Sequence, residues 1–209
     1  MFILYNKFLP ENISSASHHQ WLDELSKIKR KKIHSLTSKQ DQHRSLIGNQ
    51  LLKTGMRLLG ETDFTLDELE YTALGKPYTS RPVFFSVSHA DELVCCALSS
   101  KNKIGIDTEL RSKKQQIEFS RYFSADELEQ ISKDMTLFPD LWTRKEAVSK
   151  AHDDKGLQDI PEIKLEKYTA KLHGGQWWIY PVDLHHSHIT HIACNQPVSD
   201  LTICEVDIT

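Results

Sequence analysis

The sequence lacks the features of membrane, secreted and low-complexity proteins. None of its apolar runs approaches the roughly 18 to 20 residues that cross a bilayer. The opening residues 1–12 have neither the basic segment nor the long apolar stretch of a signal peptide. Glycine and proline are scarce, with 8 and 7 among 209 residues, which excludes collagen-like and Pro/Gly-rich disordered chains. We therefore expect a globular, cytoplasmic protein that is large enough to bury its own core.

Cysteine is also scarce. The chain has the neighbours Cys95 and Cys96, followed by Cys194 and Cys204, which form neither a CxxC pair nor a dense disulfide spacing. We expect buried thiols, which suit a reducing compartment.

Acidic residues are almost missing from one segment. Residues 26–57 contain nine Lys or Arg and a single acid, Asp41, so this segment carries +8 while the rest of the chain carries −11. This density favours an anionic partner, which would be nucleic acid, a phosphate-rich small molecule or an acidic protein, unless the segment is only a solvated helical face. A nucleic-acid-binding module is disfavoured, because the segment has no Phe, Tyr or Trp on which bases would stack.

The apolar pattern of the first sixty residues predicts a short strand followed by helices. The strand is expected at residues 2–5, and residues 18–60 are expected to be helical with a break near 36–37. Ser38 would cap the second helix with a capping-box-like contact from Asp41, and Gly60 would end it. Gly48 and Gly55 share one stripe of this helix with Arg44 and Leu51, which predicts close packing against another backbone or a ligand.

The remaining pattern predicts strands, then helices, then strands again. Residues 83–88, 93–98 and 103–109 are expected to be neighbouring antiparallel strands. Ser124 and Glu127 form a capping box, and Pro139 suits the first residue of a helix that runs to about residue 151. Residues 163–209 are strand-like. This order predicts an α+β chain of two halves, residues 1–110 and 111–209.

Two carboxylates project from one face of the strand at residues 103–109. Alternation places Asp107 and Glu109 beside Gly105, with Ile104 and Ile106 on the opposite face. Neighbouring carboxylates repel each other unless a cation intervenes, and oxygen ligands of this kind suit Mg²⁺. The alternative is an exposed pair on an edge strand.

Further polar groups lie at three other places in the chain. Trp142, Glu146 and Lys150 recur at i, i+4 and i+8 on one helix, which offers a third carboxylate and an ammonium, or merely a surface ion pair. The run from Phe85 to His89 ends in hydroxyl and imidazole groups that can bind phosphate or ribose oxygens. Lys76 lies at the tip of a Gly-Lys-Pro turn.

Taken together and in order, these motifs resemble the Sfp-type 4′-phosphopantetheinyl transferases, over residues 25–160. The motifs are Arg44-x-x-x-Gly48-x-x-Leu51, Gly75-Lys76-Pro77, Phe85-Ser86-Val87-Ser88-His89, Ile104-Gly105-Ile106-Asp107-Thr108-Glu109 and Trp142-Thr143-Arg144-Lys145-Glu146-Ala147-x-x-Lys150-Ala151. The resemblance implies two α+β halves related by a pseudo-twofold axis, with the active site at their interface. It also implies an Mg²⁺-dependent enzyme that moves the phosphopantetheine arm of coenzyme A onto a serine of an apo acyl, peptidyl or aryl carrier protein and releases adenosine 3′,5′-bisphosphate.

The resemblance also implies roles for individual residues. Asp107, Glu109 and Glu146 would be the Mg²⁺ ligands, and Lys150 would take part in catalysis as well as phosphate binding. Coenzyme A would be held by basic and polar side chains from both halves, namely Lys29, Lys32, Arg44, Lys76, Ser88, His89 and Lys150. Thr108 departs from the aliphatic residue usual in the family, but it lies on the opposite strand face. The resemblance implies a monomer acting in fatty acid, polyketide or nonribosomal peptide synthesis or in lysine metabolism, with no nucleic-acid or membrane partner.

Several alternatives stay open at the sequence level. The base that takes the serine proton is either Glu146 or a water on the metal. The same three carboxylates would also serve another Mg²⁺-dependent phosphotransferase or a nuclease. His185, His186, His188 and His191 offer a transition-metal site, with His186 and His188 on one strand face, but no Cys or carboxylate lies at a companion spacing, so we interpret them as solvated or structural.

Overall fold

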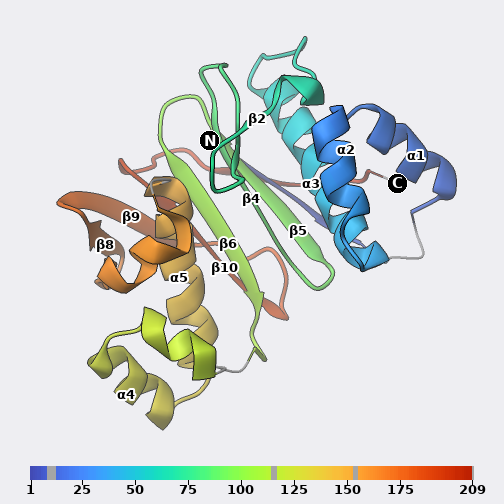
Figure 1. Ribbon diagram of the computed structural model, residues 1–209. Coiled ribbons are helices and arrows are strands. Elements are labelled where there is room, and N and C mark those ends of the chain that lie inside the picture. The colour runs from blue at the N-terminus through green and yellow to red at the C-terminus, as the bar shows by residue number, and fades with distance from the viewer. Residues whose placement is uncertain (9–12, 114–116, 153–154, 209) are drawn as a thin grey trace. The chain divides into compact units, whose positions relative to one another are not determined.

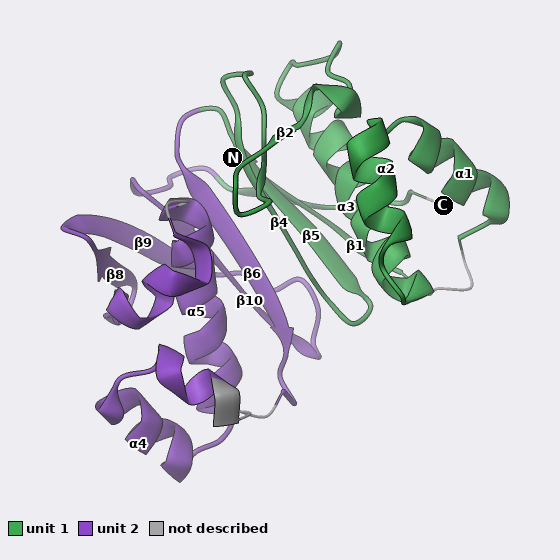
Figure 2. Cartoon of the chain, viewed as in Figure 1, with its two compact units in different colours: residues 1–100, 201–209 green, residues 101–200 purple. Residues whose placement is uncertain are grey.

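The chain divides into two compact units, each built around its own sheet. The structure is a computed structural model that describes residues 1–8, 13–113, 117–152 and 155–208 (Figure 1). Unit 1 comprises residues 1–100 and 201–209, and unit 2 comprises residues 101–200 (Figure 2). The mixture of helices and strands confirms the predicted α+β class. Among the described residues, no helix is long and apolar enough to cross a membrane.

Unit 1 is a four-stranded sheet with three helices. Its strand order is β11-β1-β5-β4, in which β11 is parallel to β1 and the other neighbours are antiparallel. The strands are β1 (Phe2–Lys7), β4 (Phe84–Ala90), β5 (Leu93–Ser99) and β11 (Thr202–Glu205). The helices are α1 (Ser15–Asp23), α2 (Lys27–His34) and α3 (Lys39–Leu58), followed by the short η2 (Leu66–Glu68), β2 (Glu70–Tyr71) and β3 (Pro77–Tyr78).

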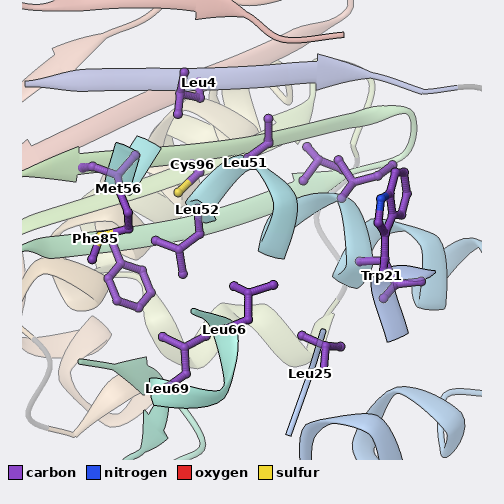
Figure 3. Close-up of a cluster of buried hydrophobic side chains, with 14 of the residues drawn as sticks. Leu4, Trp21, Leu25, Leu51, Leu52, Met56, Leu66, Leu69, Phe85 and Cys96 are labelled. Carbon is purple, nitrogen blue, oxygen red and sulfur yellow. The ribbon is translucent and has the colours of Figure 1, made fainter. Parts of the chain in front are cut away.

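Helix α3 packs tightly on the sheet of unit 1. Cβ atoms added at Gly48 and Gly55 would meet Val87 Cγ1 at 2.9 Å and Leu98 Cδ1 at 2.3 Å. The glycine stripe therefore lies against side chains of the strands. Figure 3 shows the core that results, in which Leu51 and Leu52 of α3 are buried with strand residues such as Leu4, Phe85 and Cys96.

The predicted ends of α3 are confirmed, although one predicted contact differs. Ser38 Oγ accepts a hydrogen bond from the Asp41 backbone N–H at 3.4 Å, and Gly60 follows the helix with a φ of +94°. The Asp41 carboxylate accepts from Arg44 Nη1 at 2.6 Å instead of closing a capping box. The segment 18–60 also breaks once more, between α1 and α2.

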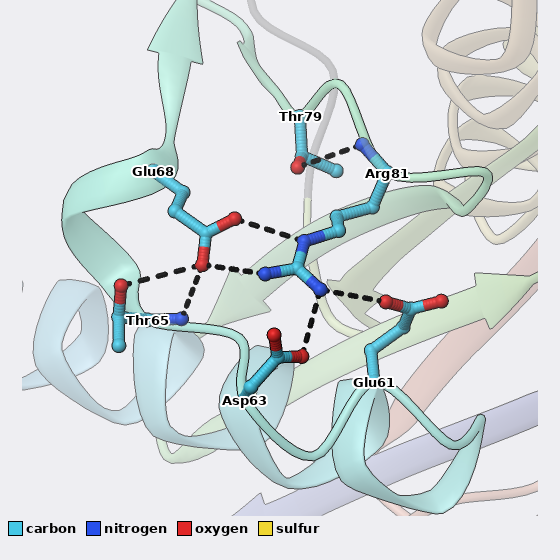
Figure 4. Close-up of polar contacts among 6 residues, drawn as sticks. All are labelled: Glu61, Asp63, Thr65, Glu68, Thr79 and Arg81. Carbon is cyan, nitrogen blue, oxygen red and sulfur yellow. Dashed lines mark hydrogen bonds and ion pairs between the residues drawn. The ribbon is translucent and has the colours of Figure 1, made fainter.

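Arg81 ties the segment before β4 to the region after α3. Its guanidinium donates to Glu68, Glu61 and Asp63 at 2.8 to 3.0 Å (Figure 4). Glu68 also accepts from the Thr65 backbone N–H in a capping box at the start of η2. These contacts hold the loop from which the β2–β3 turn projects.

Unit 2 is a five-stranded sheet with the order β6-β10-β9-β8-β7. The strands are β6 (Ile104–Leu110), β7 (Lys164–Leu165), β8 (Thr169–Leu172), β9 (Gly175–Pro181) and β10 (His188–Cys194). The helices are η3 (Ile117–Tyr122), α4 (Ala125–Lys133), α5 (Leu137–His152) and η4 (Gly156–Glu162). The expected pairing of residues 103–109 with 93–98 is wrong, because β5 lies between β1 and β4 and leaves no edge for β6.

The boundaries of the compact units follow these sheets. β6 belongs to unit 2 because it pairs with β10, although the sequence division at residues 110 and 111 placed it in the first half. Residues 201–209 return to unit 1 because β11 pairs with β1.

Helix α5 packs directly on β6 in unit 2. A Cβ at Gly105 would lie 2.0 Å from the Ala147 carbonyl oxygen and 2.6 Å from the Ala151 nitrogen. The capping box of Ser124 and Glu127 before α4 is confirmed, whereas α5 begins at Leu137, two residues before Pro139. This contact between strand and helix fixes the residues considered next.

Candidate functional site

The structure brings three predicted carboxylates of unit 2 together. Asp107 and Glu109 project from β6, and Glu146 projects from α5, which lies on that strand. Lys150 joins two of them, because its Nζ lies 2.6 Å from Asp107 Oδ1 and 3.3 Å from Glu146 Oε2. Asp107 is only 3% exposed. The i, i+4 pair of Glu146 and Lys150 is therefore not an isolated surface ion pair.

Glu109 has a basic partner of its own. Lys113 forms an ion pair with the Glu109 carboxylate. Lys113 was not among the predicted site residues, although it follows Glu109 by four residues in the sequence. Unit 2 thus places two ammonium groups beside three carboxylates.

Burial and mutual repulsion raise the pKa of the two glutamates, Glu109 and Glu146. Burial, followed by the charge of Asp107, raises the pKa of Glu146 to about 7 against the opposing effect of Lys150. Burial also raises the pKa of Glu109, despite its ion pair with Lys113. Crowded carboxylates that hold protons this strongly have the oxygen donor set that a divalent cation such as Mg²⁺ prefers. The residues present therefore fit the metal implied by the sequence.

An aromatic cavity borders the carboxylates. Its volume is about 330 Å³, and it is lined by Glu109, Lys113, Phe119, Arg121, Tyr122, Trp142, Glu146 and Leu157. Phe119 and Trp142 meet edge to face with ring centroids 4.8 Å apart. Of the residues lining it, Trp142 and the two glutamates were predicted. Phe119 and Tyr122 were not, and their i, i+3 spacing was the available signal. The cavity offers an apolar wall next to a charged end.

A buried lysine anchors the helix that carries Glu146. Lys145 is 1% exposed, and its Nζ donates to the carbonyl oxygens of Tyr122 and Ile163 at 3.1 and 3.2 Å. It also lies 2.9 Å from Glu127 Oε2. Because these partners satisfy all three N–H donors, Lys145 fixes the rotation of α5 and with it the direction of Glu146.

In unit 1, two of the predicted phosphate ligands converge on one ring. The Nζ atoms of Lys29 and Lys32 lie 5.5 and 5.8 Å from the centroid of Tyr71. A Cβ at Gly75 would lie 3.3 Å from Lys32 Nζ, so the turn that carries Lys76 is adjacent. Burial, followed by the charge of Lys32, lowers the pKa of Lys29 to about 8. Two ammonium groups held this close together favour the binding of an anion.

The neighbouring basic residues of α2 are placed differently. Arg30 donates to the Asp23 carboxylate at 3.0 Å. Lys27, Lys31 and Lys32 are all exposed, but Lys32, like Lys29, lies over the Tyr71 ring. The structure therefore distinguishes Lys29 and Lys32 from the rest of a run that the sequence alone could not resolve.

The other predicted coenzyme ligands also lie in unit 1. The backbone of Lys76 closes its turn, because its carbonyl accepts from the Thr72 N–H and its N–H donates to Thr72 Oγ1. Near the end of β4, Ser88 is buried and His89 is exposed. Arg44 donates to the Asp91 carbonyl at 2.7 Å as well as to Asp41, and its contact with the Asp91 carboxylate is looser, at 3.8 Å.

The four C-terminal histidines do not form one cluster. His191 faces α5, where its Nδ1 lies 2.8 Å from Thr143 Oγ1, and burial lowers its pKa to about 3. His186 lies in the turn before β10, so its expected strand face shared with His188 is wrong. His185 and His188 approach each other in the same turn.

Comparison with known proteins finds similarity to one superfamily. A family model described as the 4′-phosphopantetheinyl transferase superfamily matches residues 103–193, which include all three carboxylates and Lys150. Over these residues the chain is similar to this superfamily. It is 29% identical over 181 residues to the 4′-phosphopantetheinyl transferase Sfp of Bacillus subtilis (strain 168), which covers 81% of this chain and 76% of that protein.

Two further relatives of the chain have the same activity in their names. A second 4′-phosphopantetheinyl transferase of Bacillus subtilis is 28% identical over 177 residues, with the same coverage. The 4′-phosphopantetheinyl transferase gsp of Aneurinibacillus migulanus is 29% identical over 152 residues, covering 68% of this chain and 62% of that protein. The resemblance predicted from the motifs is confirmed.

Proposed function

We propose that this protein transfers the 4′-phosphopantetheine arm of coenzyme A to a serine of an apo carrier protein, with Mg²⁺, and releases adenosine 3′,5′-bisphosphate. The observation that carries the proposal is the grouping of Asp107, Glu109 and Glu146 with Lys150 beside an aromatic cavity. This grouping lies in the segment that matches the superfamily. The four free cysteines support a cytoplasmic location.

The three carboxylates would hold the metal. Asp107, Glu109 and Glu146 supply oxygen ligands only, which suits Mg²⁺ with water and phosphate completing its coordination. When bound, the ion would neutralise charge on the coenzyme's diphosphate. Lys150 supplies fixed positive charge at the same place, because it already bridges Asp107 and Glu146.

Glu146 would receive the proton of the attacking serine. The serine oxygen forms a bond to the phosphorus that carries the pantetheine arm, and the bond from this phosphorus to the bridging oxygen breaks, so that adenosine 3′,5′-bisphosphate leaves with the charge. Glu146 suits the role of base by position, since it borders the cavity and is 18% exposed. Lys150 would stabilise the leaving phosphate. Positioning and charge neutralisation would then account for most of the rate acceleration.

Coenzyme A would be held by apolar and cationic groups. The cavity lined by Phe119, Tyr122 and Trp142 would take the pantetheine arm, and its volume of about 330 Å³ lies within the range of ligand pockets. In unit 1, Lys29 and Lys32 would bind the 3′-phosphate.

The remaining predicted ligands would bind polar groups of the nucleotide. Lys76, Ser88 and His89 would bind phosphate and ribose oxygens, with His89 near the 3′-phosphate. Arg44 would contact a phosphate through Nη2, whose ion pair with Asp91 is loose.

Intact-mass spectrometry of apo carrier proteins tests the proposal. Carriers of fatty acid, polyketide and nonribosomal peptide synthesis, and of lysine metabolism, are incubated with the protein, coenzyme A and Mg²⁺, with EDTA as the control. We expect a metal-dependent gain of one phosphopantetheine, and the rates on different carriers rank the substrates. Coenzyme A cleavage without transfer would instead indicate another Mg²⁺-dependent phosphotransferase or a nuclease.

Matched variants test the site residues. Asp107→Ala and Glu146→Ala should abolish transfer, because each removes a proposed metal ligand. Glu129→Ala is the control, since Glu129 belongs to an exposed i, i+4 ion pair with Lys133 on α4. Wild-type rates in either site variant would contradict the metal assignment.

A further inference from the structure

Three donor atoms converge in the turn between β9 and β10. His185 Nδ1 lies 3.2 Å from His188 Nδ1, and Ser187 Oγ lies 2.8 Å from the first and 2.9 Å from the second. These atoms form a nearly equilateral triangle. All three residues belong to unit 2, and the transfer reaction proposed above uses none of them.

Hydrogen atoms on these three groups cannot place a hydrogen bond on every edge of the triangle. If both imidazoles carry a proton on Nδ1, both can donate to Ser187 Oγ, but the edge between the histidines then has no hydrogen bond. If only one Nδ1 is protonated, that hydrogen and the serine hydroxyl supply two hydrogens for three contacts. A single cation, in contrast, accepts a lone pair from all three atoms at once.

We propose that His185 and His188 bind a divalent transition-metal ion, Zn²⁺ in the first instance, with Ser187 Oγ beside them. Zinc binds imidazole nitrogen at about 2.0 to 2.1 Å in a tetrahedral arrangement, which puts two nitrogen ligands about 3.3 to 3.4 Å apart. The observed separation of 3.2 Å is close to this spacing. Imidazole nitrogen suits Zn²⁺, Cu²⁺ and Ni²⁺ rather than Mg²⁺.

The turn holds these ligands in place without an ion. His188 is 2% exposed, and its backbone N–H donates to the His185 carbonyl at 3.0 Å. Arg111 extends from the end of β6 and bonds this turn twice, through its backbone N–H to Ser187 O at 2.9 Å and through Nε to His186 O at 3.1 Å. Binding would therefore need little rearrangement. Waters would complete the coordination.

Calorimetric titration of Zn²⁺ into the full-length, chelator-treated protein tests the site. Millimolar Mg²⁺ is present throughout to occupy the carboxylates. We expect one bound Zn²⁺ in the wild type and at least a tenfold loss of affinity in His185→Ala. His34→Ala, which removes an exposed imidazole at the end of α2, should bind as the wild type does.

Two further measurements separate this site from the carboxylates and from folding effects. Asp107→Ala should keep the Zn²⁺ site, so loss of transfer activity and loss of zinc binding are independent outcomes. In ¹⁵N spectra of the imidazoles, Zn²⁺ should shift the Nδ1 signals of His185 and His188 but not that of His34. Equal zinc affinity in wild type and His185→Ala, or unshifted His185 and His188 signals, would overturn the proposal.

Discussion

Gly105 lies where β6 approaches α5 most closely, so adding one methyl group there should separate the carboxylates. A Cβ at this position would lie 2.0 Å from the Ala147 oxygen, about 1.4 Å short of the 3.4 Å at which ordinary contact begins. It would also lie 2.6 Å from the Ala151 nitrogen, the i+4 hydrogen-bonding partner expected for that oxygen. Both obstacles are backbone, so no side-chain rotation relieves the overlap. Gly105→Ala must therefore push the helix away from the strand.

This displacement should affect activity more than stability. Overpacking a core costs typically about 1 to 3 kcal/mol, which for a chain of this size lowers the melting temperature by about 2 to 12 °C. The shift also moves Glu146 and Lys150 away from Asp107 and Glu109. A misplacement of about 1 Å can cost about 100-fold in rate. We expect at least this loss in the transfer assay after normalising for the folded fraction.

Gly48→Ala in α3 is the matched control. Its Cβ would lie 2.9 Å from Val87 Cγ1, which belongs to a stiff β-branched side chain, so Gly48→Ala also overpacks a core, but in the unit that lacks the three carboxylates. It should lower the melting temperature by about 2 to 12 °C at most and keep the activity of the folded protein within a factor of about two. A Gly105→Ala variant with wild-type rate and melting temperature would refute the close packing of α5 on β6.

The remaining predictions concern charged groups of unit 2. In EDTA, the free energy of unfolding should fall as the pH rises from 4.5 to about 7, because folded Glu146 keeps a proton that the unfolded chain releases. In urea titrations at pH 8, the free energy of unfolding of Glu146→Gln should exceed that of the wild type by about 1 to 3 kcal/mol. A less stable variant would contradict this prediction. Burial raises the pKa of Asp159, but bonds from His173 and His152 outweigh it and leave the pKa below 3.8. The stability from these bonds should be present above pH 3.8 and lost as the pH falls through the lower pKa of the folded state, so the melting temperatures of wild type and Asp159→Asn should differ at pH 7 and converge in strong acid. In denaturant titrations, the free energy of unfolding of Lys145→Met should be about 3 to 5 kcal/mol below that of the wild type, because the mostly buried charge of Glu127 loses its partner. A decrease of less than about 1 kcal/mol would contradict the buried ion pair.

Local signals in the sequence predicted the ends of helices and the faces of strands. Ser38, Gly60 and the Ser124–Glu127 capping box act within a few residues, and the alternation that placed Asp107 beside Glu109 needs only one strand. These features depend on nearby atoms, so a single stretch of sequence contains their cause.

Pairing between distant segments was not predictable in the same way. Nothing local distinguishes β6 as a partner of β10 from β6 as a partner of β5, because both pairings bury the same apolar face. Likewise, the choice of Lys29 and Lys32 among neighbouring cations depends on Tyr71, about forty residues away along the chain. The burial of Lys145 was not predictable from its neighbours in sequence, because its acceptors, Tyr122 O and Ile163 O, belong to other segments.

Because β11 returns to the sheet of unit 1, the sheets of the two units are completed at different times during synthesis. Unit 2 has all its strands once residue 194 has left the ribosome. Its two ends meet as soon as the next residue emerges, since the Asn195 N–H donates to Lys103 O at 3.4 Å. The edge of β1 in unit 1 stays open until β11 emerges, so the domain that begins first is completed last. In a nascent chain, unit 2 should therefore become resistant to proteases before unit 1 does. A stalled chain that ends before residue 201 would expose the edge of β1, which is prone to association with other chains.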